Sequence, residues 1–172
     1  MSRPWPTAAH VVLGLVERLG EATPYDLKTV AAGSTNFLFQ LPHTQIYTQC
    51  EKLVAAGLLD ERRESEGRRR RLLTITPAGA SALQEWRDDP TVVPVEARDL
   101  ALLKIFMGAE PAVIGPAQVT AHRAQLERYR EMATAGGDDL DDGVRAALDF
   151  GTRYEEALVD FWSTLVERSA RS

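Results

Sequence analysis

The sequence predicts a mainly α-helical protein with one small β-hairpin, and three observations support this fold class. Residues 1–90 contain three helical patterns, then two short strand patterns around a turn, then a fourth helical pattern. A stretch with two prolines and no periodicity follows at residues 89–94, and only helical patterns come after it. This order predicts a winged helix-turn-helix domain at residues 1–90, with the hairpin as its wing, and a helical domain at residues 95–172.

Composition excludes several classes of protein. The chain has 172 residues, of which 44% are hydrophobic and 26% charged, as in folded proteins rather than disordered ones. A single cysteine excludes a disulfide framework and a cysteine-based zinc site, and it suits a reducing cytosol. No apolar run approaches the ~20 residues that cross a bilayer, and the N-terminus lacks the apolar core of a signal peptide. We therefore expect a cytoplasmic protein that does not associate with membranes.

The first two helices are predicted from periodicity and from their end signals. In the first, Thr7–Leu19, apolar residues recur with a period near 3.6, Thr7 is the expected N-cap and Gly20 ends the helix. The second begins after Thr23 as N-cap, with Pro24 in its first turn, and ends at Gly33.

The third helix, expected from about Pro42 to Gly57, divides into two faces. Its apolar face comprises Ile46, Cys50, Leu53 and Val54, so we interpret Cys50 as a core residue. Its polar face comprises His43, Thr44, Gln45, Tyr47, Thr48, Gln49 and Lys52. In a winged helix-turn-helix this helix enters the major groove, where glutamine can bond adenine and hydroxyls can reach phosphates. The alternative is the ordinary solvated face of an amphipathic helix.

The hairpin favours the DNA-binding interpretation. Strands are expected at residues 58–64 and 70–76, and six arginines lie within ten residues: Arg62, Arg63, Arg68, Arg69, Arg70 and Arg71. Neighbouring carboxylates can pair with the first two, which leaves the run 68–71 without local partners. Because alternate strand residues point to opposite faces, not all four can contact one ligand. We assign Arg68 and Arg69, nearest the tip, to minor-groove phosphates, and Arg70 to DNA as well.

Overall charge does not contradict this assignment. The net charge is −5, but residues 1–90 carry 11 basic and 11 acidic residues and are neutral. Binding to a polyanion follows the local field more than the sum over the chain. The arginine cluster can therefore act as a local cationic site on a neutral domain.

The C-terminal half is predicted to form three helices and a dimer. Leu100–Met107 is apolar on nearly all sides, a second helix runs from Pro116 to Ala135, and a third starts near Leu140. Apolar residues on this last helix recur at steps of three and four, as in a coiled coil. They predict a dimer interface of Val144, Leu148, Tyr154, Leu158, Phe161 and Leu165. The alternative is that the two preceding helices cover this seam within the chain.

A set of short motifs resembles a known family. The motifs are His10-Val-Val-Leu-Gly-Leu15, Thr23-Pro-Tyr-Asp-Leu27, His43-Thr-Gln-Ile-Tyr47, Leu53-Val-Ala-Ala-Gly-Leu-Leu59, Gly67-Arg-Arg-Arg-Arg71 and Thr74-Ile-Thr-Pro-Ala-Gly79. Together they are similar to the N-terminal domain of the PadR family of bacterial transcriptional regulators. The second half, with Leu103-Lys-Ile-Phe-Met-Gly108 and a long final helix, is similar to the helical domain of the virulence-activator-like branch. Leu72-Leu73-Thr74 departs from the family, whose wing usually has an aromatic residue there.

The resemblance implies a homodimer whose last helices pack across a two-fold axis, and a repressor more often than an activator. Some family members respond to small aromatic compounds. By this analogy alone, the candidate effector contacts are Trp86, Trp162 and Tyr154, which are otherwise core or interface aromatics.

Other chemistries find no support in the sequence. The three histidines lack ligand spacing, and residues 138–143 fail the calcium-loop pattern at Leu140, so we predict no metal site. We interpret these acids as the start of the last helix, and His122 as a satisfied core or interface histidine. Without a phosphate loop or nucleophile elbow, neither an enzyme nor a cofactor is predicted.

The sequence therefore predicts a sequence-specific DNA-binding regulator. A two-fold dimer would bind a palindromic operator whose half-sites are about 10 base pairs apart, or a multiple of that. The alternative is a winged-helix module for protein–protein interaction.

Overall fold

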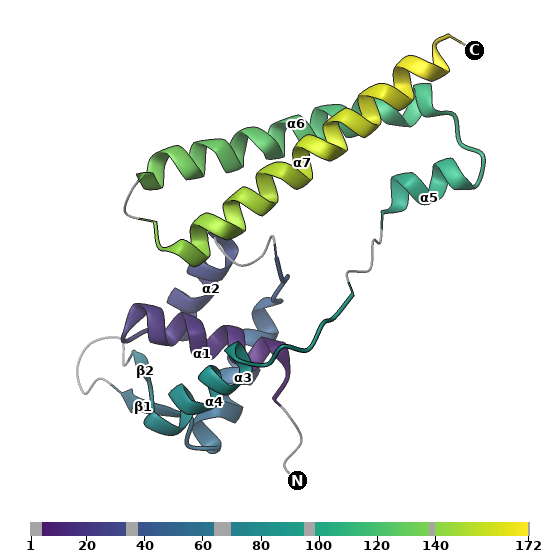
Figure 1. The fold of residues 1–172 in the computed structure, drawn as a ribbon. Coiled ribbons are helices and arrows are strands. Elements are labelled where there is room, and N and C mark those ends of the chain that lie inside the picture. Colours follow the sequence, from purple (N-terminus) through teal and green to yellow (C-terminus); the bar gives the residue numbers. More distant parts are fainter. Residues whose placement is uncertain (1–4, 34–37, 64–69, 95–98, 138–139, 172) are drawn as a thin grey trace. The chain divides into compact units, whose positions relative to one another are not determined.

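The structure is a computed structural model that describes residues 5–33, 38–63, 70–94, 99–137 and 140–171 (Figure 1). Helices and one antiparallel strand pair make up the described elements, which confirms the predicted fold class. The chain divides into two compact units, unit 1 (Met1–Val93) and unit 2 (Pro94–Ser172). Unit 1 holds α1 (Thr7–Leu19), α2 (Pro24–Gly33), α3 (His43–Ala55), β1 (Leu59–Arg63), β2 (Arg71–Ile75) and α4 (Pro77–Arg87).

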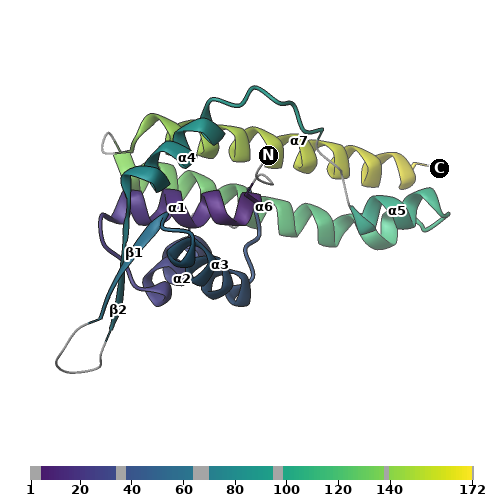
Figure 2. The ribbon, with the colours of Figure 1, turned by 90° about the horizontal axis from the view of Figure 1, so that it is seen from below.

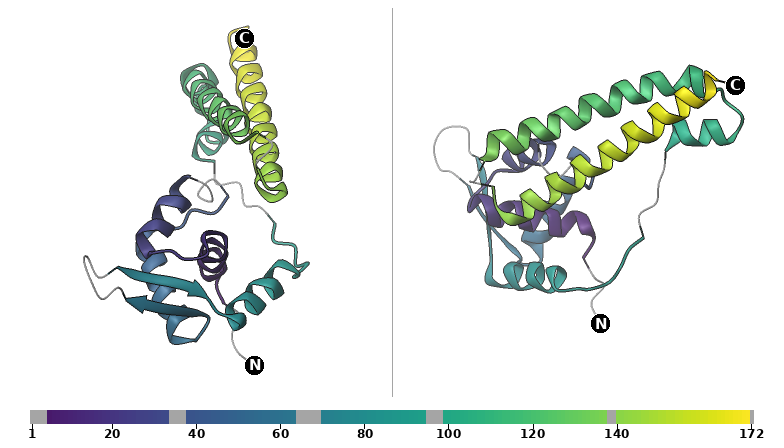
Figure 3. Two further views of the ribbon diagram at one scale, coloured as in Figure 1. Left: turned by 90° about the vertical axis from the view of Figure 1, so that its left-hand side faces the viewer. Right: turned by 45° about the horizontal axis from the view of Figure 1, so that its top comes forward.

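Helix α1 lies at the centre of unit 1. It packs against α2, α3, α4 and β2, which surround it in the left view of Figure 3. Val12, Leu13 and Val16 of α1 are completely buried. The other fully enclosed large side chains come from every surrounding element: Leu27, Ile46, Cys50, Leu53, Leu59, Leu73 and Leu83. This core fixes α3 and the hairpin relative to each other.

The hairpin is anchored to the helices at one end. Its register runs from Leu59 opposite Ile75 to Arg63 opposite Arg71, so both strands are slightly shorter than predicted. Leu73 also forms a bridge with Ala22, in which each backbone N–H donates to the other residue's carbonyl, at 2.9 and 3.1 Å. The bridge attaches β2 to the segment that leads into α2. From there the two strands run out side by side (Figure 2).

The helix starts confirm one predicted cap and correct another. Thr23 caps α2, because its Oγ1 accepts from the Asp26 N–H at 3.1 Å while the Asp26 carboxylate accepts from the Thr23 N–H at 2.9 Å. Thr7 was predicted as the N-cap of α1, but it is the first residue of the helix. Pro6 occupies the cap position and makes no side-chain hydrogen bond there. Periodicity located the helix correctly, whereas the hydroxyl misled the assignment of its first residue.

Unit 2 is a long helical hairpin preceded by a short helix. It comprises α5 (Leu100–Phe106), α6 (Pro111–Gly136) and α7 (Asp142–Ser169), and α6 packs along α7. As expected, an acid caps α7: Asp141 Oδ1 accepts from the Val144 N–H at 2.8 Å. Asp138 and Asp139 lie outside the described residues.

Helix α6 begins five residues before the predicted start. Pro116 lies inside the helix rather than opening it, and Pro111 is the first residue of the helix. A proline inside a helix removes one backbone hydrogen bond, which is why it was interpreted as the start. Packing of the preceding turn against α7 explains the difference: a Cβ on Gly115 would lie 2.2 Å from a Val166 methyl. The close contact between α6 and α7 at Gly115 stabilises the helical turn that precedes Pro116.

The predicted seam of α7 is divided between two faces. Leu148, Gly151, Glu155 and Trp162 are buried, and the Tyr129 ring of α6 lies against Gly151. His122 pairs with Glu155 across the same contact, with 2.6 Å between Nδ1 and Oε2, as expected of a satisfied histidine. Tyr154 and Phe161 are exposed on another face. Leu148 of the predicted dimer interface thus already packs within its own chain.

Candidate nucleic-acid interface

The outward face of α3 is a continuous polar surface. Its exposed residues are His43, Thr44, Gln45, Tyr47, Thr48, Glu51 and Lys52, of which Glu51 is the one acid. Ile46, Cys50 and Leu53 are buried on the other face, so the predicted division of this helix is confirmed at these positions. Burial raises the pKa of the Cys50 thiol to about 11, which keeps it protonated and unreactive, as expected of a core residue.

Gln49 corrects the predicted face. Only 7% of this residue is exposed, whereas it was expected among the outward side chains. It lies three residues after Ile46 and four before Leu53, and therefore falls on the buried stripe of the helix. Its polarity suggested the solvent side, but its position on the helix determines where it points.

Thr48 is exposed, but its hydroxyl already forms a hydrogen bond within α3. The hydroxyl donates to the Thr44 carbonyl at 2.9 Å. It can therefore offer a methyl group to a base, or an acceptor oxygen, but not a free donor to a phosphate.

Arg62, Arg63 and Arg71 of the hairpin each form an ion pair. Arg63 pairs with Glu61 at 2.9 Å, as predicted. Arg62, also predicted to pair with a neighbouring carboxylate, pairs instead with Glu21 at 3.0 Å, a residue 41 positions away that lies between α1 and α2. Arg71 was expected to lack a local partner, but its Nε lies 2.5 Å from Glu61 Oε2. The prediction treated strand residues as neighbours along the chain, whereas pairing of β1 with β2 brings Glu61 and Arg71 together. Arg68 and Arg69 lie outside the described residues.

Glu61 accepts bonds from two arginines and is the anionic centre of this cluster. The hydrogen bond from Arg63, together with that from Arg71, holds the pKa of the Glu61 carboxyl below its usual value. It therefore remains ionised at neutral pH, between two guanidiniums.

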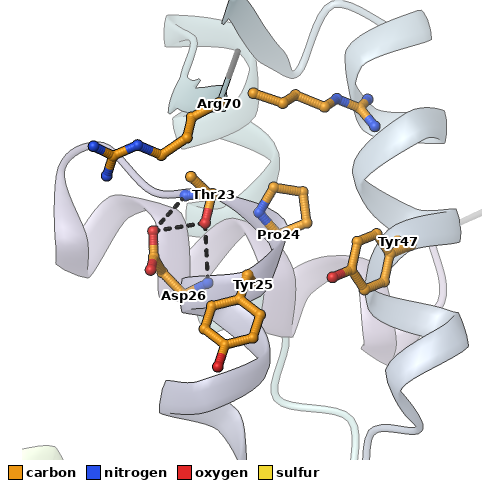
Figure 4. Close-up of a pocket in the computed structure, with 7 residues that line it drawn as sticks. Thr23, Pro24, Tyr25, Asp26, Tyr47 and Arg70 are labelled. Carbon is orange, nitrogen blue, oxygen red and sulfur yellow. Dashed lines mark hydrogen bonds between the residues drawn. The ribbon is translucent and has the colours of Figure 1, made fainter. Parts of the chain in front are cut away.

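A pocket of about 420 Å³ joins the start of α2, α3 and the start of β2 (Figure 4). Its lining residues are Thr23, Pro24, Tyr25, Asp26, Tyr47, Arg70 and Arg71. The Tyr47 hydroxyl points from α3 toward the start of α2, and the Arg70 side chain extends past the Thr23–Asp26 cap (Figure 4). The bonds from Thr23 are the main cause of a lowered pKa of the Asp26 carboxyl, to which the charge of Arg70 also contributes.

The pocket combines the groups that bind a DNA backbone. Tyr25, Tyr47, Arg70 and Arg71 line it together with the start of α2, which is the positive end of the helix dipole. Hydroxyl and guanidinium groups are residue types that bind phosphate oxygens. Tyr25 was not among the predicted site residues, although 64% of it is exposed. The signal was available, because Tyr25 follows Pro24 in the first turn of a helix beside the predicted recognition helix.

The three aromatic residues proposed as effector contacts belong to two different units of the chain. Trp86, in unit 1, stacks on His10 with ring centroids 5.1 Å apart and is 42% exposed. In unit 2, Tyr154 is exposed and stacks on Phe150, whereas Trp162 is completely buried and meets Phe161 edge-on. The structure thus separates Tyr154 and Trp162 onto different faces of α7.

Two further kinds of feature are absent from the described residues. No helix among them is both long and apolar enough to cross a membrane. Within the same ranges, no three histidine, cysteine or acidic side chains cluster in a way that could hold a metal ion.

Known proteins are similar to this chain in part of the sequence and in the fold. Residues 12–85 match the family model described as "Transcriptional regulator PadR-like family". The "Negative transcriptional regulator PadR" of Bacillus subtilis (strain 168) is 26% identical over 99 residues. That match covers 56% of this chain and 54% of the relative, so it spans about half the length of each.

Solved structures are similar over nearly the whole chain. Bacillus subtilis PadR in complex with operator DNA has a TM-score of 0.84 at 20% identity and covers 95% of this chain and 99% of its own. The same protein in complex with p-coumaric acid has a TM-score of 0.79 at 19% identity, covering 99% of both chains. The Vibrio cholerae virulence activator AphA has a TM-score of 0.73 at 26% identity and covers 96% of this chain and 99% of its own.

Proposed function

Because residues 12–85 match the PadR-like family of transcriptional regulators, we propose that the chain is a member of this family and acts as a sequence-specific DNA-binding repressor that binds a palindromic operator as a homodimer. We further propose that a small aromatic compound relieves repression. A regulator of bacterial DNA acts in the cytoplasm, which is where we place it.

One observation carries the proposal: the polar face of α3 and the pocket at the base of the wing are continuous through Tyr47. Gln45, two residues before Tyr47, is exposed near the helix N-terminus, where a recognition helix meets base edges. On this proposal Gln45 reads a base, while Tyr47 and Arg70 bind the backbone. His43, Thr44 and Lys52 complete the contact surface. Arg68 and Arg69, which lie outside the described residues, remain proposed phosphate contacts.

Exposed apolar side chains support a dimer through unit 2. On α7 the uncovered aromatic residues are Phe150, Tyr154 and Phe161, a different face from the one that packs on α6. The other large exposed apolar residues described in this unit are Leu100, Leu102, Leu103, Phe106, Met107, Val113 and Met132. So much exposed apolar surface is typical of an interface, and a second copy is the partner that a closed two-fold assembly requires.

The proposed interface differs from the one predicted. Tyr154, Leu158, Phe161 and Leu165 remain in it as exposed or half-buried residues. Val144 is also half-buried, whereas Leu148 contributes to the contact with α6 instead.

Effector relief is supported by analogy with the complex of Bacillus subtilis PadR and p-coumaric acid. Trp86 and Tyr154 are exposed, and on this proposal their rings stack with an aromatic ligand, whereas the buried Trp162 would first have to be uncovered. p-Coumaric acid is thus a suitable first probe, and release of bound DNA is the expected response.

Selection of genomic fragments by the purified protein tests DNA recognition. We expect enrichment of a palindromic site and a salt-sensitive gel shift. Gln45→Ala should then lose about 1–3 kcal/mol of binding free energy at one base position. Gln84→Ala, at an exposed position on α4, is the matched control and should bind like the parent.

Failure to enrich any sequence would contradict the proposal. The winged-helix module for protein–protein interaction would then be the better interpretation. Enrichment of a site without two-fold symmetry would instead contradict the homodimeric mode of binding.

A further inference from the structure

The arrangement of Glu61, Arg63 and Arg71 extends the proposed interface. These three residues share one face of the hairpin, because alternate strand residues point the same way and Arg63 lies directly opposite Arg71. Leu59 and Leu73, on the same face, are buried in the core. The triad therefore continues, beyond the core, the face of the hairpin that is turned toward the helices.

Two arginines directly opposite each other should destabilise a strand pair. Glu61 offsets this repulsion by accepting from the Nε of both, at 2.9 Å from Arg63 and 2.5 Å from Arg71. Its side chain is 15% exposed, against 77% for Arg63 and 26% for Arg71. The carboxylate thus lies within the hairpin, while the cations lie nearer the surface.

Both arginines bind the Glu61 carboxylate through Nε, and this geometry affects their remaining donors. A guanidinium is planar, and a carboxylate bound at Nε leaves the far Nη group directed away from it. The carboxylate therefore fixes the plane of each guanidinium without using all of its donors. Arg71 also lines the pocket that contains Tyr47, so its oriented guanidinium lies beside α3.

We infer that Glu61 is a positioning residue for DNA binding, which orients Arg63 and Arg71 so that their Nη groups hold backbone phosphate beside α3. The inference rests on the proposed function. It assigns DNA contacts to Arg63 and Arg71, two arginines that are already engaged in ion pairs. It also gives an acidic residue a favourable role in binding a polyanion.

Simple electrostatics predicts the opposite effect of removing this acid. Loss of a negative charge near a phosphate should tighten binding, since repulsion is relieved. If Glu61 orients its neighbours, Glu61→Gln should instead weaken binding, because a neutral amide holds guanidiniums less strongly. The sign of the change therefore distinguishes the two accounts.

The test measures affinity for a labelled duplex of the genomic fragment enriched in the selection, by fluorescence anisotropy at several salt concentrations. We expect Glu61→Gln to bind about fivefold to tenfold more weakly, with a salt slope smaller by about 0.9 for each phosphate that is no longer neutralised. Asp60→Asn is the matched control: it removes the same charge from the exposed, opposite face of β1 and should bind as tightly as the parent or slightly more so.

A second set of variants separates orientation from folding. In an Arg63→Ala, Arg71→Ala background, Glu61→Gln should weaken binding no further, because no guanidinium remains to be oriented. Arg63→Lys and Arg71→Lys retain the charge but lack the guanidinium fork, and each should weaken binding as Glu61→Gln does. These lysine variants test the inference even if Glu61→Gln fails to fold.

Unchanged or tighter binding by Glu61→Gln would overturn the inference, as would an equal weakening in the double-alanine background or normal binding by both lysine variants. If the parent protein enriches no fragment, the proposed function itself fails, which is a separate result.

Discussion

The two units of the chain bury their apolar residues to different extents. Unit 1 encloses a core to which every one of its described helices and strands contributes. Unit 2 buries one face of α7 against α6, but leaves Phe106 82% and Phe161 43% exposed. A unit that closes on itself can present a polar surface to a ligand, whereas an uncovered apolar face is typical of a surface that binds another molecule. The difference separates the proposed tasks of binding DNA and of pairing two chains.

We expect the largest effect from a substitution that disrupts self-association through unit 2 and leaves the fold of unit 1 unchanged. Phe161→Asp puts a charge at the centre of the uncovered face and should weaken self-association by at least about a hundredfold. Analytical ultracentrifugation would show monomers, and operator affinity should fall because two half-sites are no longer bound together. Asp160→Asn, at the neighbouring exposed position, is the control. A Phe161→Asp protein that still sediments as a dimer would contradict the proposed interface.

The next effect concerns the closed core of unit 1. A Cβ on Gly79 would lie 2.1 Å from the Leu58 carbonyl oxygen, at the start of α4 where Thr76 Oγ1 accepts from the Gly79 N–H. Gly79→Ala should lower the free energy of unfolding by about 1–3 kcal/mol, measured by urea denaturation, because backbone must move.

Gly14 provides the matched control for this substitution. It lies inside α1, and the nearest atom to an added Cβ is a Leu83 methyl at 4.0 Å. Gly14→Ala should therefore stabilise the protein by about 0.5–1 kcal/mol through helix propensity alone. Equal effects of the two substitutions would show that the close approach at Gly79 does not matter.

The smallest effect is a pH dependence that belongs to unit 1. Burial lowers the pKa of His10 below its usual 6.5, against an opposing interaction with the Pro6 carbonyl. As pH falls below 6.5 the unfolded chain binds a proton that the folded chain does not, so stability decreases until the lowered pKa is reached. His10→Gln should reduce this dependence in thermal unfolding, whereas His43→Gln, at an exposed position, should retain it. Identical pH profiles for parent and His10→Gln would contradict this assignment.

The predictions that succeeded and those that failed differ in the range of the interactions behind them. The inward face of α3 was predictable because Ile46, Cys50 and Leu53 recur at helical spacing. Gln49 was misplaced because polarity was given more weight than position on the same helix. The partner of Arg71 could not be found along the chain, because Glu61 is ten residues away and adjacent only through strand pairing.

The sequence by itself determined the order of the elements, the predicted fold class and the polar character of the recognition helix, because these depend on short-range periodicity and end signals. Only the tertiary structure decided which face of α7 meets α6, how far α6 extends before Pro116, and which guanidiniums surround Glu61. Those features depend on contacts between residues far apart in the chain, whose free energies can outweigh local preferences.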